Sequence, residues 1–364
     1  MLRFLHAGDF HLDSPFSALS PRQAAKAREG QRELLSRLLA LALQKEVDIL
    51  FLTGDLFDGE KVYPETLEAL QGTLERLPAK VMISPGNHDP YTDKSPYARG
   101  TWPSNVHIFR DSRVEAVPIP ELGCTVYGSA FLESIRLSSP LEGLSLSGEG
   151  IQLGCFHADV SKKPSRYGPL SPEEIALSGL HYLALGHVHA RSELQRAGKS
   201  YYAYPGCPEG RGFDETGEKG VYYGTVDESG AVTLEFIPIC LRQYHSLTVE
   251  LRGQSAEEAL QAILPQAPTG DICRIVFRGE RREESFPLEA LYALASPYYE
   301  SLSISDETSA PQNLWAREKE EGLCGLFLRE MRHQLNQAKE DEQETILLAV
   351  RFGLAALEGR EEPQ

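Results

Sequence analysis

The sequence of 364 residues lacks the features that mark membrane and secreted proteins. No apolar run approaches the roughly 20 residues that a membrane-spanning helix needs. The first residues, MLRFLHAGDFHLD, contain no long apolar stretch, so we expect no signal peptide. Internal repeats and low-complexity segments are also lacking. These absences predict a cytoplasmic protein without a membrane partner. The length of 364 residues allows at most about three domains.

Cysteine is sparse and scattered, because the six cysteines include no close pair. This spacing argues against a zinc ribbon and a disulfide framework, and it suits the reducing cytoplasm. Cys155 and Cys273 lie inside apolar runs typical of strands. We expect both to act as small buried hydrophobic residues.

Basic residues are fewer than acidic ones. The chain has 36 Lys plus Arg against 53 Asp plus Glu, a formal net charge of −17. Proteins that bind nucleic acid broadly usually carry a basic surface, so this composition argues against nonspecific nucleic-acid binding. Residues 155–220 are an exception, because this window holds eight basic and eight acidic residues. The window also contains two closely spaced histidines, which favours an anionic substrate near them.

The first two-thirds of the chain alternates between strand and helix patterns. Apolar periodicity predicts helices over residues 24–46 and 64–77. Apolar runs predict strands over residues 2–7, 47–53, 80–84, 106–109, 124–129, 151–157, 182–185, 200–204 and 220–226. Alternation of this kind favours a sheet with helices on its faces, and the closer spacing of the later strands adds a second sheet. The predicted fold class is α/β, a sandwich of two mixed sheets with flanking helices.

The pattern changes near Arg242. Residues 245–304 predict strand, helix, strand, helix and strand, which is the size of a small α+β domain. The tail is polar at first and then predicts two amphipathic helices, separated by the acidic segment KEDEQE. We therefore predict domains over 1–242 and 243–305 and a helical tail over 306–364.

Side chains that can bind metals follow the ends of several predicted strands. They stand in the segments GDFH, GDLFD, GNHD, GCFH and GHVH, and they are Asp9, His11, Asp55, Asn87, His88, Asp89, His157, His187 and His189. Each alone has a simpler explanation, since an aspartate after a strand commonly caps a turn and a lone buried histidine is usually a core residue. Compatible ligands after successive strands instead favour one shared metal site. The remaining histidines are interpreted as structural or surface residues: His6, His107, His181, His245 and His333.

The mixture of carboxylates and imidazoles suits manganese, iron or zinc. Seven ligands from this set of nine exceed the needs of one ion but fit two ions that share a bridging carboxylate. Two ions about 3.5–4 Å apart can hold a water-derived nucleophile and a phosphoryl oxygen together for in-line displacement. We expect the glycines before Asp9, Asp55, Asn87 and His187 to allow the tight turns that bring the ligands together. The set predicts a dinuclear hydrolytic centre.

The ordered segments from Gly8 to His189 resemble those of the calcineurin-like metallophosphoesterases. The stretches HAGDFHLDSPF, WPSNVHIF and YPGCPEGRGFDETGEKG further resemble the SbcD-type DNA repair exonucleases, especially their YhaO-like branch. This resemblance implies a helix-flanked β-sandwich with a dinuclear site at one sheet edge. It also implies that residues 243–305 form a capping domain that helps to hold DNA.

The resemblance further assigns a role to each ligand. The first metal would take Asp9, His11 and His189, the second Asn87, His157 and His187, and Asp55 would bridge them. His88 would face the substrate as a general acid, oriented by Asp89. Archaeal and eukaryotic counterparts often carry a second active-site histidine after the GD motif. This chain has Asp58 there, as bacterial SbcD proteins do, so a mechanism that needs that histidine is not supported.

The function implied by the resemblance is a manganese-dependent phosphodiesterase acting on DNA, with iron or zinc as alternative metals. It would be an exonuclease with some endonuclease activity on single strands or hairpins. An SbcC-like coiled-coil ATPase and a second copy of the chain are the implied partners. The amphipathic tail over 323–357 is a candidate docking element, unless it packs on its own domain.

Two other functions stay open. One is a phosphoesterase for a small substrate, such as a nucleotide or cyclic nucleotide. The other is a scaffold subunit that binds DNA ends and has little need of its metal site. The extra domain and the local charge balance favour DNA over a small substrate, and the complete ligand set argues against a scaffold.

Overall fold

The computed structural model describes residues 1–17, 20–147, 149–161, 164–282, 285–310 and 313–360. The chain divides into two compact units. The first unit is Met1–Ser246 with the short segments Thr269–Arg274 and Tyr299–Ser301, and the second is Leu247–Pro268, Ile275–Tyr298 and Leu302–Gln364. The predicted division at residues 242 and 305 remains a prediction. None of the described helices combines the length and apolar character that crossing a bilayer requires.

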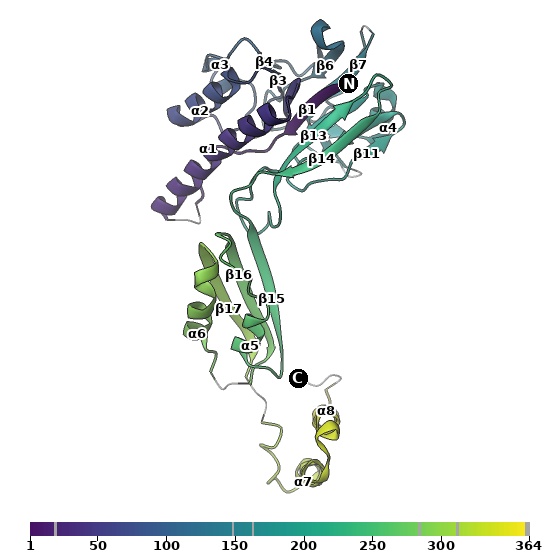
Figure 1. The fold of residues 1–364 in the computed structure, drawn as a ribbon. Coiled ribbons are helices and arrows are strands. Elements are labelled where there is room, and N and C mark those ends of the chain that lie inside the picture. The colour runs from purple at the N-terminus through teal and green to yellow at the C-terminus, as the bar shows by residue number, and fades with distance from the viewer. Residues whose placement is uncertain (18–19, 148, 162–163, 283–284, 311–312, 361–364) are drawn as a thin grey trace. The chain divides into compact units, whose positions relative to one another are not determined.

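The first unit contains two mixed six-stranded sheets, which confirms the predicted fold class (Figure 1). The first sheet has the order β14 (Val232–Pro238), β13 (Gly220–Val226), β1 (Leu2–Ala7), β2 (Ile49–Leu52), β3 (Lys80–Ile83) and β4 (Val106–Ile108). Strands β1 to β4 pair in parallel, whereas β13 is antiparallel to β1 and β14.

The second sheet has the order β11 (Gln195–Ala197), β12 (Ser200–Ala203), β10 (Tyr182–Gly186), β7 (Ile151–His157), β6 (Cys124–Gly128) and β5 (Glu115–Ile119). Its four central strands pair in parallel, and the two edge strands are antiparallel. A separate short pair consists of β8 (Asp159–Val160) and β9 (Pro169–Leu170).

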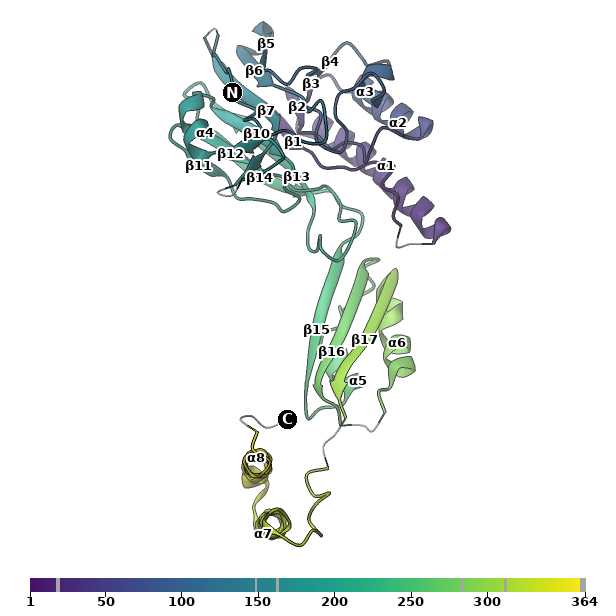
Figure 2. The ribbon, with the colours of Figure 1, turned by 180° about the vertical axis from the view of Figure 1, so that it is seen from behind.

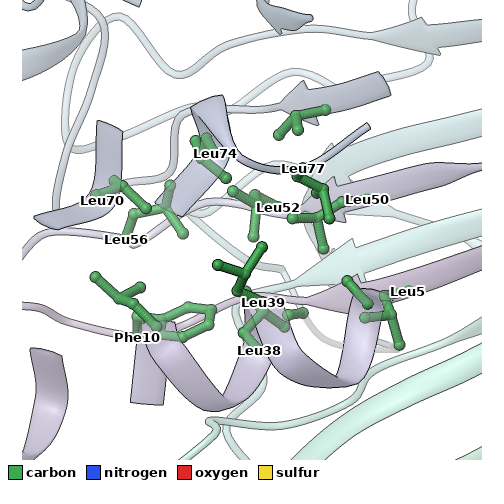
Figure 3. Close-up of a cluster of buried hydrophobic side chains, with 14 of the residues drawn as sticks. Leu5, Phe10, Leu38, Leu39, Leu50, Leu52, Leu56, Leu70, Leu74 and Leu77 are labelled. Atoms are coloured by element: carbon green, nitrogen blue, oxygen red, sulfur yellow. The ribbon is translucent and has the colours of Figure 1, made fainter. Parts of the chain in front are cut away.

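Apolar side chains on alternate positions of the strands build a core on each face of the first sheet. Helices α1 (Pro21–Gln44) and α2 (Pro64–Glu75) cover one face, where Leu38 and Leu39 of α1 gather with Leu50 and Leu52 of β2 (Figure 3). On the other face, Phe51 belongs to the core shared with the second sheet. Burial on both faces explains why β2 reads as the unbroken apolar run ILFL.

The helix ends follow local sequence signals. Ser20 caps α1 through a capping box with Gln23, and Pro21 occupies the first turn. Two shorter helices are α3 (Pro96–Arg99) and α4 (Pro172–Ser178), and the 3₁₀ turn η1 covers Pro120–Leu122. In α4, Ile175 is buried in the apolar cluster on the outer face of the second sheet.

The second unit contains most of the three-stranded sheet β15 (Tyr244–Arg252), β16 (Ile272–Glu280) and β17 (Ser301–Ser309), whose strands lie side by side in Figure 2. Its short helices are α5 (Ala256–Gln261), α6 (Leu288–Ala295) and the 3₁₀ turn η2 (Ser296–Tyr298). Two longer helices follow, α7 (Leu323–Gln337) and α8 (Glu340–Leu357). The acidic segment does not separate them as expected, because most of it forms the start of α8, where the helix dipole favours negative charge.

Candidate metal centre

Five strands deliver the predicted ligands to the carboxyl ends of the two sheets. Asp9 and His11 follow β1, Asp55 follows β2, Asn87 follows β3, His157 ends β7, and His187 and His189 follow β10. All five strands run in parallel arrays. Loops at the carboxyl ends of parallel strands are the usual place for a site in such sheets.

The first group of ligand atoms comes from Asp9, His11, Asp55 and His189, and these atoms all lie within 4.8 Å of one another. His11 Nδ1 lies 3.0 Å from Asp58 Oδ1, and His189 Nδ1 lies 2.6 Å from Glu215 Oε1. Because an ionised carboxylate only accepts, each neutral ring carries its proton on Nδ1 and presents a lone pair on Nε2.

The two Nε2 atoms of His11 and His189 lie 3.1 Å apart. Asp9 Oδ1 lies 3.9 Å from the Nε2 of His189, and Asp55 Oδ2 lies 3.8 Å from that of His11. Four electron-rich atoms therefore lie close together, although Asp9 Oδ1 also accepts a hydrogen bond from the backbone N–H of His187. A divalent cation matches this arrangement, and the partners at Nδ1 are the carboxylates that usually orient metal-binding histidines.

The second group consists of Asn87, His157 and His187. His157 Nδ1 faces the carbonyl oxygen of Thr53 at 2.9 Å, so its Nε2 is again an acceptor. That Nε2 lies 2.9 Å from Asn87 Oδ1, and His187 Nδ1 lies 3.1 Å from the same oxygen. Two acceptors at this separation repel each other unless a cation lies beside them, so this group also fits a metal.

Asp55 lies between the two groups. Its Oδ2 is 3.8 Å from His11 Nε2 and 3.5 Å from His157 Nε2, while its Oδ1 accepts a hydrogen bond from the backbone N–H of His88. A backbone hydrogen bond thus holds Oδ1, and Oδ2 lies near one histidine of each group. This is the placement that a bridging carboxylate requires.

Burial sets the protonation of the imidazoles. It lowers the pKa of His11 and His157, and it lowers the pKa of His187 to about 4. Metal binding needs neutral imidazole, so these three rings are ready to bind an ion at neutral pH without releasing a proton.

The backbone at several ligands is held in the sparsely populated region of positive φ. The values are +54° for Asp9, +46° for His11, +48° for Asp55 and +105° for His187. Such conformations cost on the order of 1–3 kcal/mol each and persist only where the surroundings impose them. Their concentration in these loops is typical of a functional site.

The glycines before the ligands act mainly by allowing close packing, which differs from the expected role in turns. Of the four, Gly54 alone has a positive φ. A Cβ on Gly186 would lie 1.9 Å from the carbonyl oxygen of Thr53, and one on Gly86 would lie 2.2 Å from Asp55 Oδ1. The loops therefore approach one another more closely than any side chain would permit.

The comparisons with known proteins agree with this geometry. Residues 2–191 match the family described as calcineurin-like phosphoesterase. The chain belongs to this family. Its centre is therefore that of a metallophosphoesterase, and divalent metal ions are the cofactors that the family and the ligand cluster both indicate.

Three curated relatives extend the comparison. The uncharacterized metallophosphoesterase YhaO of Bacillus subtilis is 30% identical over 247 residues, covering 65% of this chain and 60% of that protein. The DNA double-strand break repair protein Mre11 of Methanopyrus kandleri is 24% identical, covering 76% of this chain and 64% of that protein. The protein of the same name from Saccharolobus solfataricus is 24% identical, with coverage of 96% and 95%. The chain thus spans less than two thirds of the first two relatives.

His88 lies beside the ligands of this metallophosphoesterase but is half-exposed, with its ring centroid 4.7 Å from that of His11. Its Nδ1 lies 3.1 Å from Asp58 Oδ1, and this contact raises the pKa of His88. The same oxygen of Asp58 also faces His11 Nδ1. The hydrogen bonds from His11 and His88 hold the pKa of Asp58 well below its usual range.

The role of Asp89 in orienting His88 remains a prediction, and the structure gives this residue other partners. The buried carboxylate of Asp89 instead accepts hydrogen bonds from the backbone of residues 55–57 and Gly86, and from the hydroxyl of Tyr97. It ties the loops after β2 and β3 together, whereas Asp58 makes the contact with His88.

Asp58, Arg211 and Glu215 are polar side chains at the centre for which the sequence predicted no role. Arg211 and Glu215 both stand in the stretch YPGCPEGRGFDETGEKG, which supported the family resemblance. Arg211 Nη2 donates to Glu215 Oε1 at 3.1 Å. Neither residue closely follows a predicted strand, so the pattern of metal-binding side chains at strand ends does not include them.

Proposed function

We propose that this protein is a manganese-dependent phosphodiesterase that hydrolyses DNA, as an exonuclease with some endonuclease activity on single strands or hairpins. The observation that carries the hydrolytic part is the presence of two largely buried groups of possible metal ligands, with the half-exposed His88 beside them. Iron and zinc are the alternative metals for the same donors.

In this proposal Asp9, His11 and His189 hold one ion, Asn87, His157 and His187 hold the other, and Asp55 bridges them. When bound, the two ions would polarise a phosphoryl oxygen and lower the pKa of a water molecule from 15.7 toward about 7. His88 donates a proton to the leaving 3′ oxygen, because its contact with Asp58 favours the protonated imidazole at neutral pH.

The choice of DNA as the substrate rests on the relatives and on the predicted α+β domain over residues 243–305. Two relatives are named as DNA double-strand break repair proteins, and one of them aligns with 96% of this chain. The similarity therefore includes the segment over 243–305, for which we propose a capping role on DNA. In the same scheme the protein forms a homodimer and works with an SbcC-like coiled-coil ATPase.

The decisive experiment compares wild type and His88→Ala, each loaded with manganese. The substrates are end-labelled single- and double-stranded DNA and the generic diester bis-p-nitrophenyl phosphate. His333→Ala, which removes an exposed histidine of α7, serves as the matched control. We expect wild type and the control to degrade DNA, and His88→Ala to lose about 10²-fold or more in kcat with unchanged manganese content.

Hydrolysis of the small diester without any cleavage of DNA would support the small-substrate enzyme. An SbcC-like ATPase is then added. DNA cleavage that appears only with the ATPase would indicate a nuclease that needs its partner, and continued absence of cleavage would support the small-substrate enzyme. Binding of DNA ends with no hydrolysis of either substrate would support the scaffold.

A further inference from the structure

Arg211 brings a positive charge to the edge of the metal centre. It lies in the segment between β12 and β13, and its backbone N–H donates to Glu215 Oε2 at 2.8 Å. Its Nη2 donates to Oε1 of the same carboxylate at 3.1 Å, and that oxygen also contacts His189 Nδ1. One buried glutamate thus fixes both a predicted metal ligand and the guanidinium beside it.

The guanidinium has more donors than the protein uses. An arginine offers five N–H groups, and here Nη2 contacts Glu215 while Nη1 reaches Ser14 Oγ at 3.4 Å. The Nε–H is buried and has no hydrogen-bond partner among the described residues. A buried donor without a partner costs about 1–3 kcal/mol. The Arg211 side chain as a whole is 24% exposed, so other N–H groups of the guanidinium can still reach a ligand.

Arg211 and His88 approach the same atom of the centre. Arg211 Nη1 lies 3.8 Å from Asp58 Oδ1, and His88 Nδ1 lies 3.1 Å from that oxygen. The third neighbour of this oxygen is His11, whose other nitrogen faces the first ligand group. Arg211 and His88 therefore lie on the same carboxylate, that of Asp58, which also contacts the predicted ligand His11.

We propose that Arg211 binds a non-bridging oxygen of the scissile phosphodiester at the metal centre, and that Glu215 holds Arg211 in place. This inference rests on the phosphodiesterase part of the proposed function. A planar guanidinium suits this task because it donates two parallel hydrogen bonds to a phosphate. Its charge also stabilises the negative charge that accumulates on the phosphoryl oxygens during displacement.

The test uses the full chain loaded with manganese and measures three quantities on each variant. They are kcat/KM for bis-p-nitrophenyl phosphate, the inhibition constant of inorganic phosphate, and the manganese affinity by titration calorimetry. The variants are Arg211→Gln, Arg211→Lys and Glu215→Gln. Arg196→Gln is the matched control, because Arg196 is an exposed residue of β11 whose contacts lie outside the centre.

For Arg211→Gln we expect kcat/KM to fall about 10²-fold and phosphate inhibition to weaken at least about tenfold, with manganese affinity unchanged. Arg211→Lys should recover part of the kcat/KM and part of the phosphate inhibition, since lysine keeps the positive charge but lacks the paired N–H groups of the guanidinium. Glu215→Gln should instead lower manganese affinity about 10–100-fold, because it acts through His189.

Two outcomes would overturn the inference. The first is wild-type phosphate inhibition in Arg211→Gln or, where that variant does not fold, in Arg211→Lys. The second is a parallel loss of manganese affinity in the Arg211 variants, which would make the residue a structural partner of His189. If wild type cleaves the small diester but not DNA, the proposal of a DNA substrate is refuted. The role of Arg211 can still be measured in that case, because its test uses the small diester and phosphate.

Discussion

At the scale of single residues, the centre depends on carboxylates that contact the ligands without belonging to them. Asp58 and Glu215 each hold the Nδ1–H of one histidine, and so turn its Nε2 toward the ligand group. Such partners fix the tautomer and the orientation of the ring, and their loss typically lowers metal affinity. Asp58 has a second task, because it also contacts His88.

Replacing Asp58 by asparagine should therefore damage binding and chemistry together. We expect manganese affinity to fall about 10–100-fold through His11. At saturating manganese, kcat for DNA should fall about 10²-fold, because the variant no longer favours the protonated His88 that the leaving 3′ oxygen needs. The small diester should lose less, because its p-nitrophenolate group leaves without a proton. Calorimetric titration and steady-state kinetics measure the two effects. Asp93→Asn removes an exposed carboxylate as the control, and undiminished manganese affinity in Asp58→Asn would contradict this role.

His6 makes folding stability sensitive to acid. Its ring is fully buried between the Tyr182 hydroxyl and the Leu185 carbonyl oxygen, and burial lowers its pKa to about 3. The unfolded chain takes up a proton on this residue near pH 6.5, whereas the folded chain does not. Stability is therefore complete above pH 6.5 and is lost as the pH falls from 6.5 toward 3.

This loss amounts to about 2 kcal/mol by pH 5 for His6 alone. Urea unfolding of the metal-free protein at pH 7 and pH 5 measures the total decrease, to which other buried histidines also contribute. In His6→Gln the decrease should be smaller by about that amount. Equal decreases in wild type and variant would show that His6 does not cause the pH dependence.

At the scale of elements, the two sheets meet through backbone contacts that only glycine permits. Gly186 ends β10, where a Cβ would lie 1.9 Å from the Thr53 carbonyl oxygen, just after β2 of the other sheet. The contact sets the distance between the loops that carry Asp55 and His187. Substitution there should therefore act on the site as well as on stability.

We expect Gly186→Ala to reduce the free energy of unfolding by about 3 kcal/mol and to weaken manganese binding. Gly72→Ala is the matched control, because Gly72 lies inside α2 with nothing within 4 Å of its would-be Cβ. That variant should gain about 0.5–1 kcal/mol. Denaturant unfolding and calorimetry check both values, and a Gly186→Ala protein as stable as wild type would refute the packing argument.

At the scale of the whole molecule, the C-terminal helices remain the candidate docking element for the ATPase. In α8, Leu348 and Phe352 are 52% and 54% exposed, although Gly353 packs closely on Phe327 of α7. The helices thus pair with each other and still expose apolar side chains. A partner helix with an apolar face would cover them.

The double variant Leu348→Asp, Phe352→Asp should lose binding to an SbcC-like ATPase while it keeps wild-type hydrolysis of the small diester. Leu177→Asp is the control, since Leu177 is an 87% exposed residue of α4. Analytical ultracentrifugation or calorimetry with the purified ATPase provides the measurement. Retained ATPase binding by the double variant would remove these helices from the docking proposal.

Much of the fold could be predicted because its signals are local. The apolar runs marked the central strands, and the periodic leucines marked α1 and α2. Strands β5, β11 and β14 were missed; each lies at a sheet edge, and β5 also contains Pro118, although the edge strand β4 was found. Edge position is a property of the sheet, which no local pattern records.

The sequence by itself determined which side chains could bind metal, because each predicted ligand ends a strand or lies within four residues of its end, and parallel strands bring such positions together. Tertiary structure alone decided their partners. Asp58 rather than Asp89 contacts His88, and Glu215 holds His189 across 26 positions of the chain. Those contacts arise where separate loops converge, so their distances depend on how the two sheets pack and not on any spacing along the chain.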